Sequence, residues 1–239
     1  MSFTASATVV AVPDGHGGTS LPVLGSAVPL VLRRTADALY LVGGAAWPLG
    51  GDRLSLDIEV RAGASLRIRT AAAAVALPGL SGGESVFRVT ATVGDGGRLE
   101  YLPEPTVAAD GARHRTEIRV TLAGTASLLL RDELILGRHG EQGGSCVTML
   151  SVDRAGRPLL RQETAVRGDD EVSLGPAVLA GHRMAGSLLI VGTGTPPGSY
   201  RDGVAVLPLA DAAALVTAVA GDAHTLRQRL ASAGPATTT

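Results

Sequence analysis

The chain has 239 residues, enough to bury a sizeable core, and 45% of them are apolar, which excludes a disordered protein. Its formal net charge of −1 excludes the overall basic field of nucleic-acid-binding proteins. The lone Cys146 excludes an intramolecular disulfide framework and a Cys-x-x-Cys zinc site, and no apolar run approaches the roughly 18 residues that span a membrane.

Strands are the first elements that the chain predicts, because apolar and polar residues alternate with a period of two. In residues 54–60 every apolar side chain falls on one face of a strand and every polar one on the other. This pattern is typical of a half-buried antiparallel strand. A turn at residues 61–64 then leads into a second strand at 66–69.

The same strand–turn–strand unit recurs, and each copy takes about 30 residues. Further copies lie at 87–102 and 118–130, and a looser one lies at 149–160. Because a lone hairpin is only marginally stable, we expect stacked hairpins that pack on one another. In three copies the last apolar residue before the turn and the first leucine after it are six positions apart: Val60 and Leu66, Val93 and Leu99, Leu122 and Leu128.

These units predict a mainly β fold, in which stacked antiparallel hairpins form one extended β domain with a small C-terminal helical part. Asp211 is expected to cap a helix over residues 211–216, and Asp222 a second helix over 223–232. The expected organisation is a single domain over residues 1–239, with a β-rich part at 1–208, a helical part at 209–233 and a frayed tail at 234–239.

Motifs of enzymes and of metal sites fail when each is considered as a whole. His139 and Glu141 have the His-x-Glu spacing of zinc deaminases, but Cys146 stands alone where those enzymes need a Cys-x-x-Cys pair. The five histidines lack the close spacing of a preformed chelate, and no Gly-x-Ser-x-Gly nucleophile motif occurs. We therefore expect no catalytic residues, no stable metal site and no tightly bound cofactor.

Carboxylates beside turns and glycines are the remaining candidates for chemistry. Each has a simple structural explanation, because Asp before Gly suits a turn and an outward Glu on a strand is solvated. Their order along the chain is more informative than any one of them. The candidates are Asp52, Glu100, Glu104, Asp110 and Glu141.

A series of short motifs gives this order its meaning. They are Gly50-Gly51-Asp52, the Gly63-Ala64 turn, the segment that begins at Thr70, Glu100-Tyr101-Leu102-Pro103, Gly111-Ala112, Gly137-Arg138 followed by Gly140-Glu141, and Pro158-Leu159. Over residues 30–170 this series resembles the UreD family, also called UreH, of urease accessory proteins. Each motif is common alone, whereas the shared order and spacing are fairly specific.

The resemblance implies a role in metalloenzyme maturation rather than catalysis. A UreD-like protein binds the urease apoprotein, joins a UreF-type accessory protein and, through it, a UreG-type GTPase. The assembly delivers Ni²⁺ to the urease active site, and the UreD-like subunit provides an internal path. The resemblance also implies a cytoplasmic protein with no nucleic-acid partner and no membrane partner.

Weak oxygen ligands suit such a path, because a conduit must release the Ni²⁺ that it accepts. We hypothesise that the five candidate carboxylates include residues that line the path or its mouth. Thr70 and Arg138 complete the set of nickel-path or partner-contact candidates, and Arg138 could instead anchor a carboxylate. The alternative is a β-rich enzyme or carbohydrate-binding module unrelated to urease, for which six aromatic residues are thin material.

Overall fold

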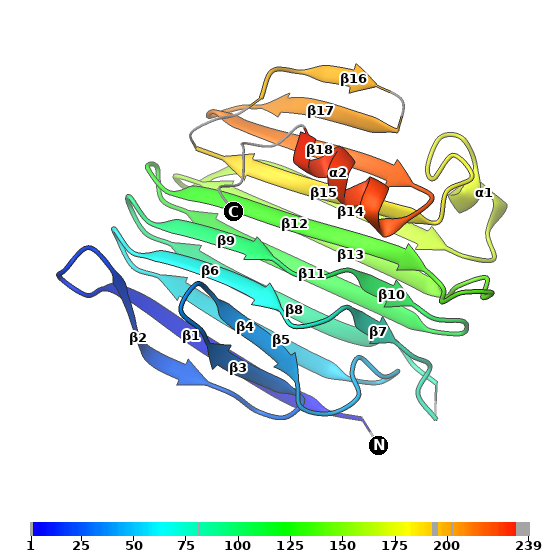
Figure 1. Cartoon of the computed structure of the whole chain (residues 1–239), viewed down its shortest axis with the longest axis horizontal. Coiled ribbons are helices and arrows are strands. Elements are labelled where there is room, and N and C mark those ends of the chain that lie inside the picture. The colour runs from blue at the N-terminus through cyan, green and yellow to red at the C-terminus, as the bar shows by residue number, and fades with distance from the viewer. Residues whose placement is uncertain (1, 81, 193–195, 202, 233–239) are drawn as a thin grey trace.

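A computed structural model describes residues 2–80, 82–192, 196–201 and 203–232. Within these residues the chain forms two β-sheets that lie face to face, a one-turn helix α1 (Glu171–Leu174) and a longer helix α2 (Ala223–Ser232) near the C-terminus (Figure 1). The prediction of a mainly β fold with a small C-terminal helical part is confirmed.

Sheet A contains seven strands, and most of them run parallel to one another. From one edge to the other they are β14 (Arg157–Arg167), β13 (Ser145–Arg154), β11 (Arg113–Leu122), β8 (Ser85–Val93), β5 (Arg53–Val60), β1 (Thr4–Pro13) and β2 (Thr19–Gly25). The five strands from β13 to β1 pair in parallel, whereas β14 and β2 pair antiparallel with their neighbours.

Sheet B contains eleven strands and is also mixed. Its main path is β16 (Ser199–Arg201), β17 (Val204–Leu209), β18 (Ala213–Ala220), β15 (Met184–Val191), β12 (Ser127–Leu136), β9 (Arg98–Leu102), β6 (Ser65–Thr70), β4 (Leu39–Gly43) and β3 (Leu30–Arg34). Two short strands, β7 (Ala74–Ala76) and β10 (Thr106–Ala108), pair beside β12. The run β4-β6-β9-β12 is parallel, as are the pairs β10–β12 and β10–β7, and the remaining pairs are antiparallel.

The repeated units are arches between the two sheets, so the prediction of antiparallel hairpins is wrong for three of the four copies. β5, β8 and β11 lie in sheet A, while the strands that follow them, β6, β9 and β12, lie in sheet B. The apolar faces of the two strands in a unit therefore meet across the core, and each strand pairs in parallel with its counterpart in the next unit. Only the looser copy, β13–β14, is a hydrogen-bonded hairpin among the described units.

The turns of successive arches stack as closely as the strands do. The backbone N–H of Gly94 donates to the Val60 carbonyl at 2.8 Å, and the N–H of Ala123 donates to the Val93 carbonyl at 2.9 Å. A Cβ atom on Gly94 would lie 2.7 Å from the backbone nitrogen of Ala62, so no larger residue fits there without a shift of the backbone. Glycine at this position therefore serves the stacking of the arches.

The main core lies between the sheets and is apolar at the end where the arches turn. Val60, Val93 and Leu122 lie side by side in register across sheet A, and each is almost completely buried. Leu66, Leu99 and Leu128 form the matching row on sheet B. Each buried aliphatic side chain contributes roughly 1.5–3 kcal/mol relative to its exposed state.

The C-terminal part differs from its prediction in one helix. Residues 211–216 do not form a helix: β18 occupies Ala213–Ala220, and Asp211 and Ala212 make a left-handed turn with φ of 54° and 52°. The alanine-rich run becomes a buried strand because it lies between β15 and β17. Helix α2 is confirmed with the predicted bounds, whereas the predicted tail 234–239 lies outside the described residues.

Candidate functional site

Two cavities lie between the sheets, away from the arches. Cavity 1 has a volume of about 380 Å³ and is lined from sheet A by Phe87, His114 and Thr116 and from sheet B by Tyr101 and Asp132. Trp47 also lines it and meets Phe87 edge-on, with ring centroids 5.3 Å apart. One wall of cavity 1 is therefore aromatic, while the other end carries polar groups.

Cavity 2 has a volume of about 430 Å³ and lies on the other side of Asp132, which lines both cavities. Its sheet A wall carries Thr148, Gln162 and Thr164. The buried side-chain oxygen of Gln162 has no hydrogen-bond partner among the described residues. An unsatisfied buried acceptor is costly unless a polar guest supplies a donor, so the wall suits water or a hydrated ion.

The strand register explains why polar groups gather here. Thr116 of β11 lies opposite Thr148 of β13, which lies opposite Thr164 of β14. On sheet B, Asp132 of β12 lies opposite Ser187 of β15, which lies opposite Thr217 of β18. Residues that are directly opposite in neighbouring strands share a face of the sheet, so each sheet presents a polar row toward the other.

Asp132 is the acidic residue at the junction of the two cavities. Burial raises its pKa to about 6, although a hydrogen bond from Thr148 acts in the opposite direction. The neighbouring core residues on the same face of β12, Leu128 and Leu130, are almost completely buried. Asp132 therefore places an ionisable oxygen pair between the sheets, where the apolar core gives way to the polar rows.

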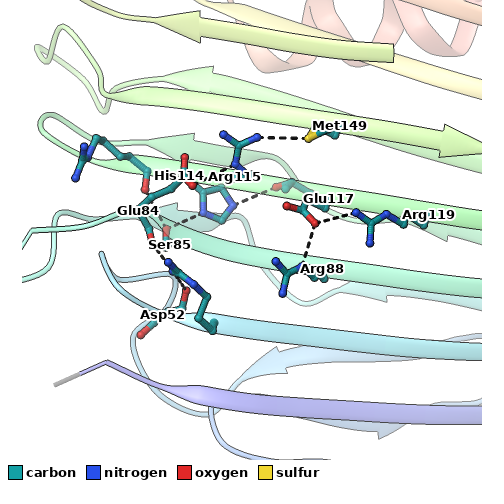
Figure 2. Close-up of polar contacts among 12 residues, drawn as sticks. Asp52, Glu84, Ser85, Arg88, His114, Arg115, Glu117, Arg119 and Met149 are labelled. Carbon is teal, nitrogen blue, oxygen red and sulfur yellow. Dashed lines mark hydrogen bonds and ion pairs between the residues drawn. The ribbon is translucent and has the colours of Figure 1, made fainter. Parts of the chain in front are cut away.

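His114 forms part of the cavity 1 wall but has both ring nitrogens engaged. Its Nδ1 lies 2.8 Å from the Ser85 Oγ, and its Nε2 lies 3.1 Å from the Thr116 Oγ1 (Figure 2). Burial lowers the pKa of His114 to about 4, so the ring is neutral near pH 7. The arrangement fixes the imidazole as a neutral hydrogen-bonding group.

Of the residues expected from the sequence, Asp52 lies in neither cavity. It is completely buried, and its carboxylate accepts the backbone N–H of Phe3 at 2.7 Å and that of Leu49 at 2.8 Å. The loop before β5 is thereby joined to the segment that begins β1. The geometry gives Asp52 a structural role at this junction.

Glu100 lies on the outer face of sheet B, away from the cavities. Its carboxylate accepts from the Arg67 Nε at 2.6 Å and from the Arg98 Nη2 at 2.7 Å. Burial opposes ionisation of Glu100, but these two guanidinium groups outweigh it and lower its pKa. The side chain is only 7% exposed because the two arginines cover it.

Thr70 and Glu104 come together at the rim of cavity 1, which both residues line. The Thr70 Oγ1 accepts the backbone N–H of Glu104 at 2.8 Å and donates to the Ala72 carbonyl at 3.0 Å. The Glu104 carboxylate is bound by Arg227 of helix α2. These two expected residues line cavity 1, whereas Arg138 and Glu141 line a separate pocket beside the loop after β12.

Asp110, Arg138 and Glu141 form a separate cluster that closes the loop after β12. The Asp110 Oδ1 accepts the Gly143 N–H at 2.5 Å, and the Glu141 Oε1 accepts from the Arg138 Nε at 2.7 Å. Hydrogen bonds from the Arg138 side chain and backbone lower the pKa of Glu141 to about 2. Arg183 adds bonds to the carbonyls of Glu141 and Gln142, both at 2.6 Å. The cluster holds a loop, with Arg138 anchoring Glu141.

Residues that could hold a metal ion tightly are not gathered anywhere in the described part of the chain. No group of three or more His, Cys, Asp and Glu side chains lies close enough together to hold one there. Neither described helix has the length and apolar character that crossing a bilayer requires.

The cavity residues have a sequence signal of their own, which differs from the position beside turns and glycines that defined the candidate carboxylates. In β12 the inward positions are Leu128, Leu130, Asp132 and Leu134, so a carboxylate occupies an apolar phase of the strand. His114 and Thr116 likewise precede Ile118, Val120 and Leu122 in the inward phase of β11. A polar residue in the buried phase of an alternating strand is the signal that locates the cavities.

Comparison with known proteins finds a family match over residues 4–236, which is almost the whole chain. The model of the family described as UreD urease accessory protein matches residues 4–236. "Urease accessory protein UreD 3" of Streptomyces griseus is 49% identical, and the match covers 96% of this chain and 95% of the relative. "Urease accessory protein UreD" of Parafrankia is 46% identical over 92% of this chain and 84% of the relative, and that of Streptomyces coelicolor is 44% identical over 95% and 93%.

Proposed function

The chain belongs to the UreD family of urease accessory proteins, and we propose that it binds urease apoprotein and assists the insertion of Ni²⁺ into its active site. In this proposal it acts in the cytoplasm, within a complex with UreF-type and UreG-type proteins. It carries Ni²⁺ as cargo and performs no catalysis of its own. The family match argues against the alternative of an enzyme or carbohydrate-binding module unrelated to urease.

The observation that carries the proposal is the junction of two inter-sheet cavities at Asp132. A cation that enters cavity 1 past Thr70 and Glu104 meets Asp132 before it reaches the hydroxyl groups of cavity 2. In this proposal the ion passes from one cavity to the other at Asp132, which lines both. The route uses residues from both sheets, so it depends on the packing of the whole domain.

The chemistry of the lining supports transit over storage. Hydroxyl and amide oxygens together with the carboxylates of Glu104 and Asp132 bind Ni²⁺ weakly and exchange readily with water, whereas a cluster of imidazole and thiolate groups would hold it. Besides His114, the described lining of the two cavities contains one imidazole, that of His182. His114 offers no free ring nitrogen, and Cys146 is buried, with burial raising the pKa of its thiol. The lining thus favours release of the ion at the far opening.

Partner docking is supported by exposed apolar side chains close to the openings. Tyr200 and Val178 line cavity 2 and are 85% and 40% exposed. Leu80 is fully exposed and follows the cavity 1 residue Leu77 by three positions. Contiguous exposed apolar patches mark interaction sites, and these side chains are candidates for parts of such patches.

The test is co-expression with urease structural subunits and the other accessory proteins, using Asp132→Asn. The expected result is a marked loss of nickel per urease active site and of urease activity, while the variant still co-purifies with its partners. Asp57→Asn, on the exposed face of β5, is the matched control and should load nickel normally. Normal nickel loading by a stable Asp132→Asn variant would refute the route, and failure of the parent chain to co-purify with urease or its accessory proteins would refute the function.

A further inference from the structure

The carboxylate of Glu104 is turned away from the cavity whose rim its residue forms. Its Oε1 lies 3.3 Å from the Arg227 Nη1 and its Oε2 lies 3.1 Å from the Arg227 Nη2. Arg131 lies 3.6 Å from the same carboxylate. Both arginines are on the outer side of sheet B, so the charge of Glu104 is neutralised outside the sandwich.

Helix α2 sets the position of Arg227. The Asp222 carboxylate accepts the Thr225 N–H at 2.8 Å and begins the helix, and Leu226 and Leu230 are buried against sheet B. In Figure 1 the helix lies across one end of that sheet, where it contacts β15 and β18. Arg227, next to Leu226, therefore reaches the carboxylates on the neighbouring strands.

One guanidinium nitrogen bridges two carboxylates that differ in burial. The Arg227 Nη2 lies 2.7 Å from the Glu133 Oε2 and 3.1 Å from the Glu104 Oε2. The Glu133 side chain is 1% exposed, whereas that of Glu104 is 35% exposed. Glu133 fixes the guanidinium in place, and the guanidinium in turn holds the more exposed carboxylate of Glu104.

The backbone beside Glu104 is fixed independently of α2. Thr70 accepts the Glu104 N–H at 2.8 Å, and the Arg131 Nη2 donates to the Pro103 carbonyl at 2.8 Å. Loss of the Arg227 contact therefore leaves the Cα of Glu104 at the rim and leaves the carboxylate with the longer Arg131 contact at 3.6 Å. Held by that contact alone, the carboxylate can turn toward the opening of cavity 1.

We propose that Arg227 is a positioning residue that keeps the Glu104 carboxylate out of the mouth of cavity 1, so that displacement of α2 adds a negative charge there. The inference rests on the proposed passage of Ni²⁺ through the cavities. Because coupling between two sites is reciprocal, a cation drawn to Glu104 competes with Arg227 and weakens the hold on α2. A partner that displaced α2 would thereby change the charge at the entrance.

Nickel titration of the purified chain tests this directly, with NiCl₂ as the probe and heat as the readout. Arg227→Met should raise the affinity for Ni²⁺ by about fivefold or more, a typical size for a coupling of this kind. The double variant Arg227→Met/Glu104→Gln should return to the parent affinity. Arg229→Met is the matched control, because the Arg229 guanidinium donates to the Val219 carbonyl and contacts no carboxylate among the described residues.

The Arg227→Met change leaves Glu133 buried without its closest partner, so a Glu133→Gln background provides a second set of variants that removes this charge. An unchanged affinity in Arg227→Met in either background would overturn the inference, as would a rise that persists with Glu104→Gln. These results are separate from those for the function. Loss of nickel delivery in Asp132→Asn with no effect of Arg227→Met refutes only the coupling, and the reverse outcome refutes only the route.

Discussion

Replacing Asp52 with alanine removes the carboxylate that joins the start of β1 to the loop before β5. Asp52 is completely buried and accepts two backbone N–H groups, from Phe3 at 2.7 Å and from Leu49 at 2.8 Å. In the Asp52→Ala variant both donors lose their charged acceptor in an environment that is closed to water. The sequence alone led us to place this residue on a nickel path, so the variant separates a structural role from a transport role.

The expected cost follows from the two bonds. A hydrogen bond to a charged group contributes about 1.5–3 kcal/mol, so the loss of both destabilises the fold by about 3–5 kcal/mol after some relaxation. For a chain of this length each kcal/mol lowers Tm by roughly 2–4 °C, which gives a fall of about 6–20 °C. Asp52→Asn keeps the shape and one acceptor, so its fall in Tm should be about half as large.

Differential scanning calorimetry measures this shift, and nickel loading of co-expressed urease measures the other role. Asp57→Ala is the control, because Asp57 lies on the exposed face of the same strand. The structural assignment predicts a large fall in Tm for Asp52→Ala, with nickel loading per folded molecule retained at low temperature. A Tm within about 1 °C of the parent, combined with lost nickel loading, would show that the assignment is wrong.

Three further predictions concern the interior and the arches. Burial lowers the pKa of His114 to about 4 from an ordinary value of 6.5, so as the pH falls the unfolded chain binds a proton before the folded chain does. The free energy of unfolding should therefore fall by about 3 kcal/mol from pH 7 to pH 4, and His114→Gln should flatten this pH dependence in urea titrations. Burial raises the pKa of Asp132 to about 6 from 3.8, so the stability that the fold has with a protonated Asp132 is lost as the pH rises through 6. Asp132→Asn should therefore stabilise the chain at pH 8 by about 2–3 kcal/mol, and no gain would contradict the assigned environment. Gly94→Ala should lower Tm by several degrees because the new Cβ would lie 2.7 Å from a backbone atom. Gly124→Ala is the control and should change Tm by much less, because its Cβ would lie 4.0 Å from its nearest neighbour. Equal effects of the two substitutions on Tm would show that the stacked turns are less tightly packed than described.

The strands could be predicted from the sequence because alternation reports which face of a strand is buried. It does not report which neighbour a strand pairs with, and a hairpin and an arch bury the same residues. The spacing of Val60 and Leu66 therefore predicted the turn correctly. Only the structure shows that the two strands joined by this turn belong to different sheets. The helix expected at 211–216 failed because burial between two strands outweighed the helix propensity of alanine.

The candidate site was predictable in part for a similar reason. Thr70 and Glu104 lie at a cavity, but their neighbours in the motif series, such as Arg138 and Glu141, hold a loop. Motif order identifies a family without separating residues that shape its fold from those that line its interior. The sequence alone could have singled out Asp132, because it occupies an inward position in the alternation of β12. Only the packing of both sheets shows that it lines two cavities.

The parallel stacking of the arches has a consequence for how the chain is made. Strands β5, β8, β11 and β13 are neighbours in sheet A in the same order as they leave the ribosome, and β6, β9 and β12 follow the same rule in sheet B. The strands of each newly synthesised arch can thus pair with the strands of the arch before it, which are already in place, and no long loop has to close first. Assembly can advance one arch at a time during translation, so cavity 1, whose lining ends at Asp132, is formed before cavity 2, which also needs β15 and β18.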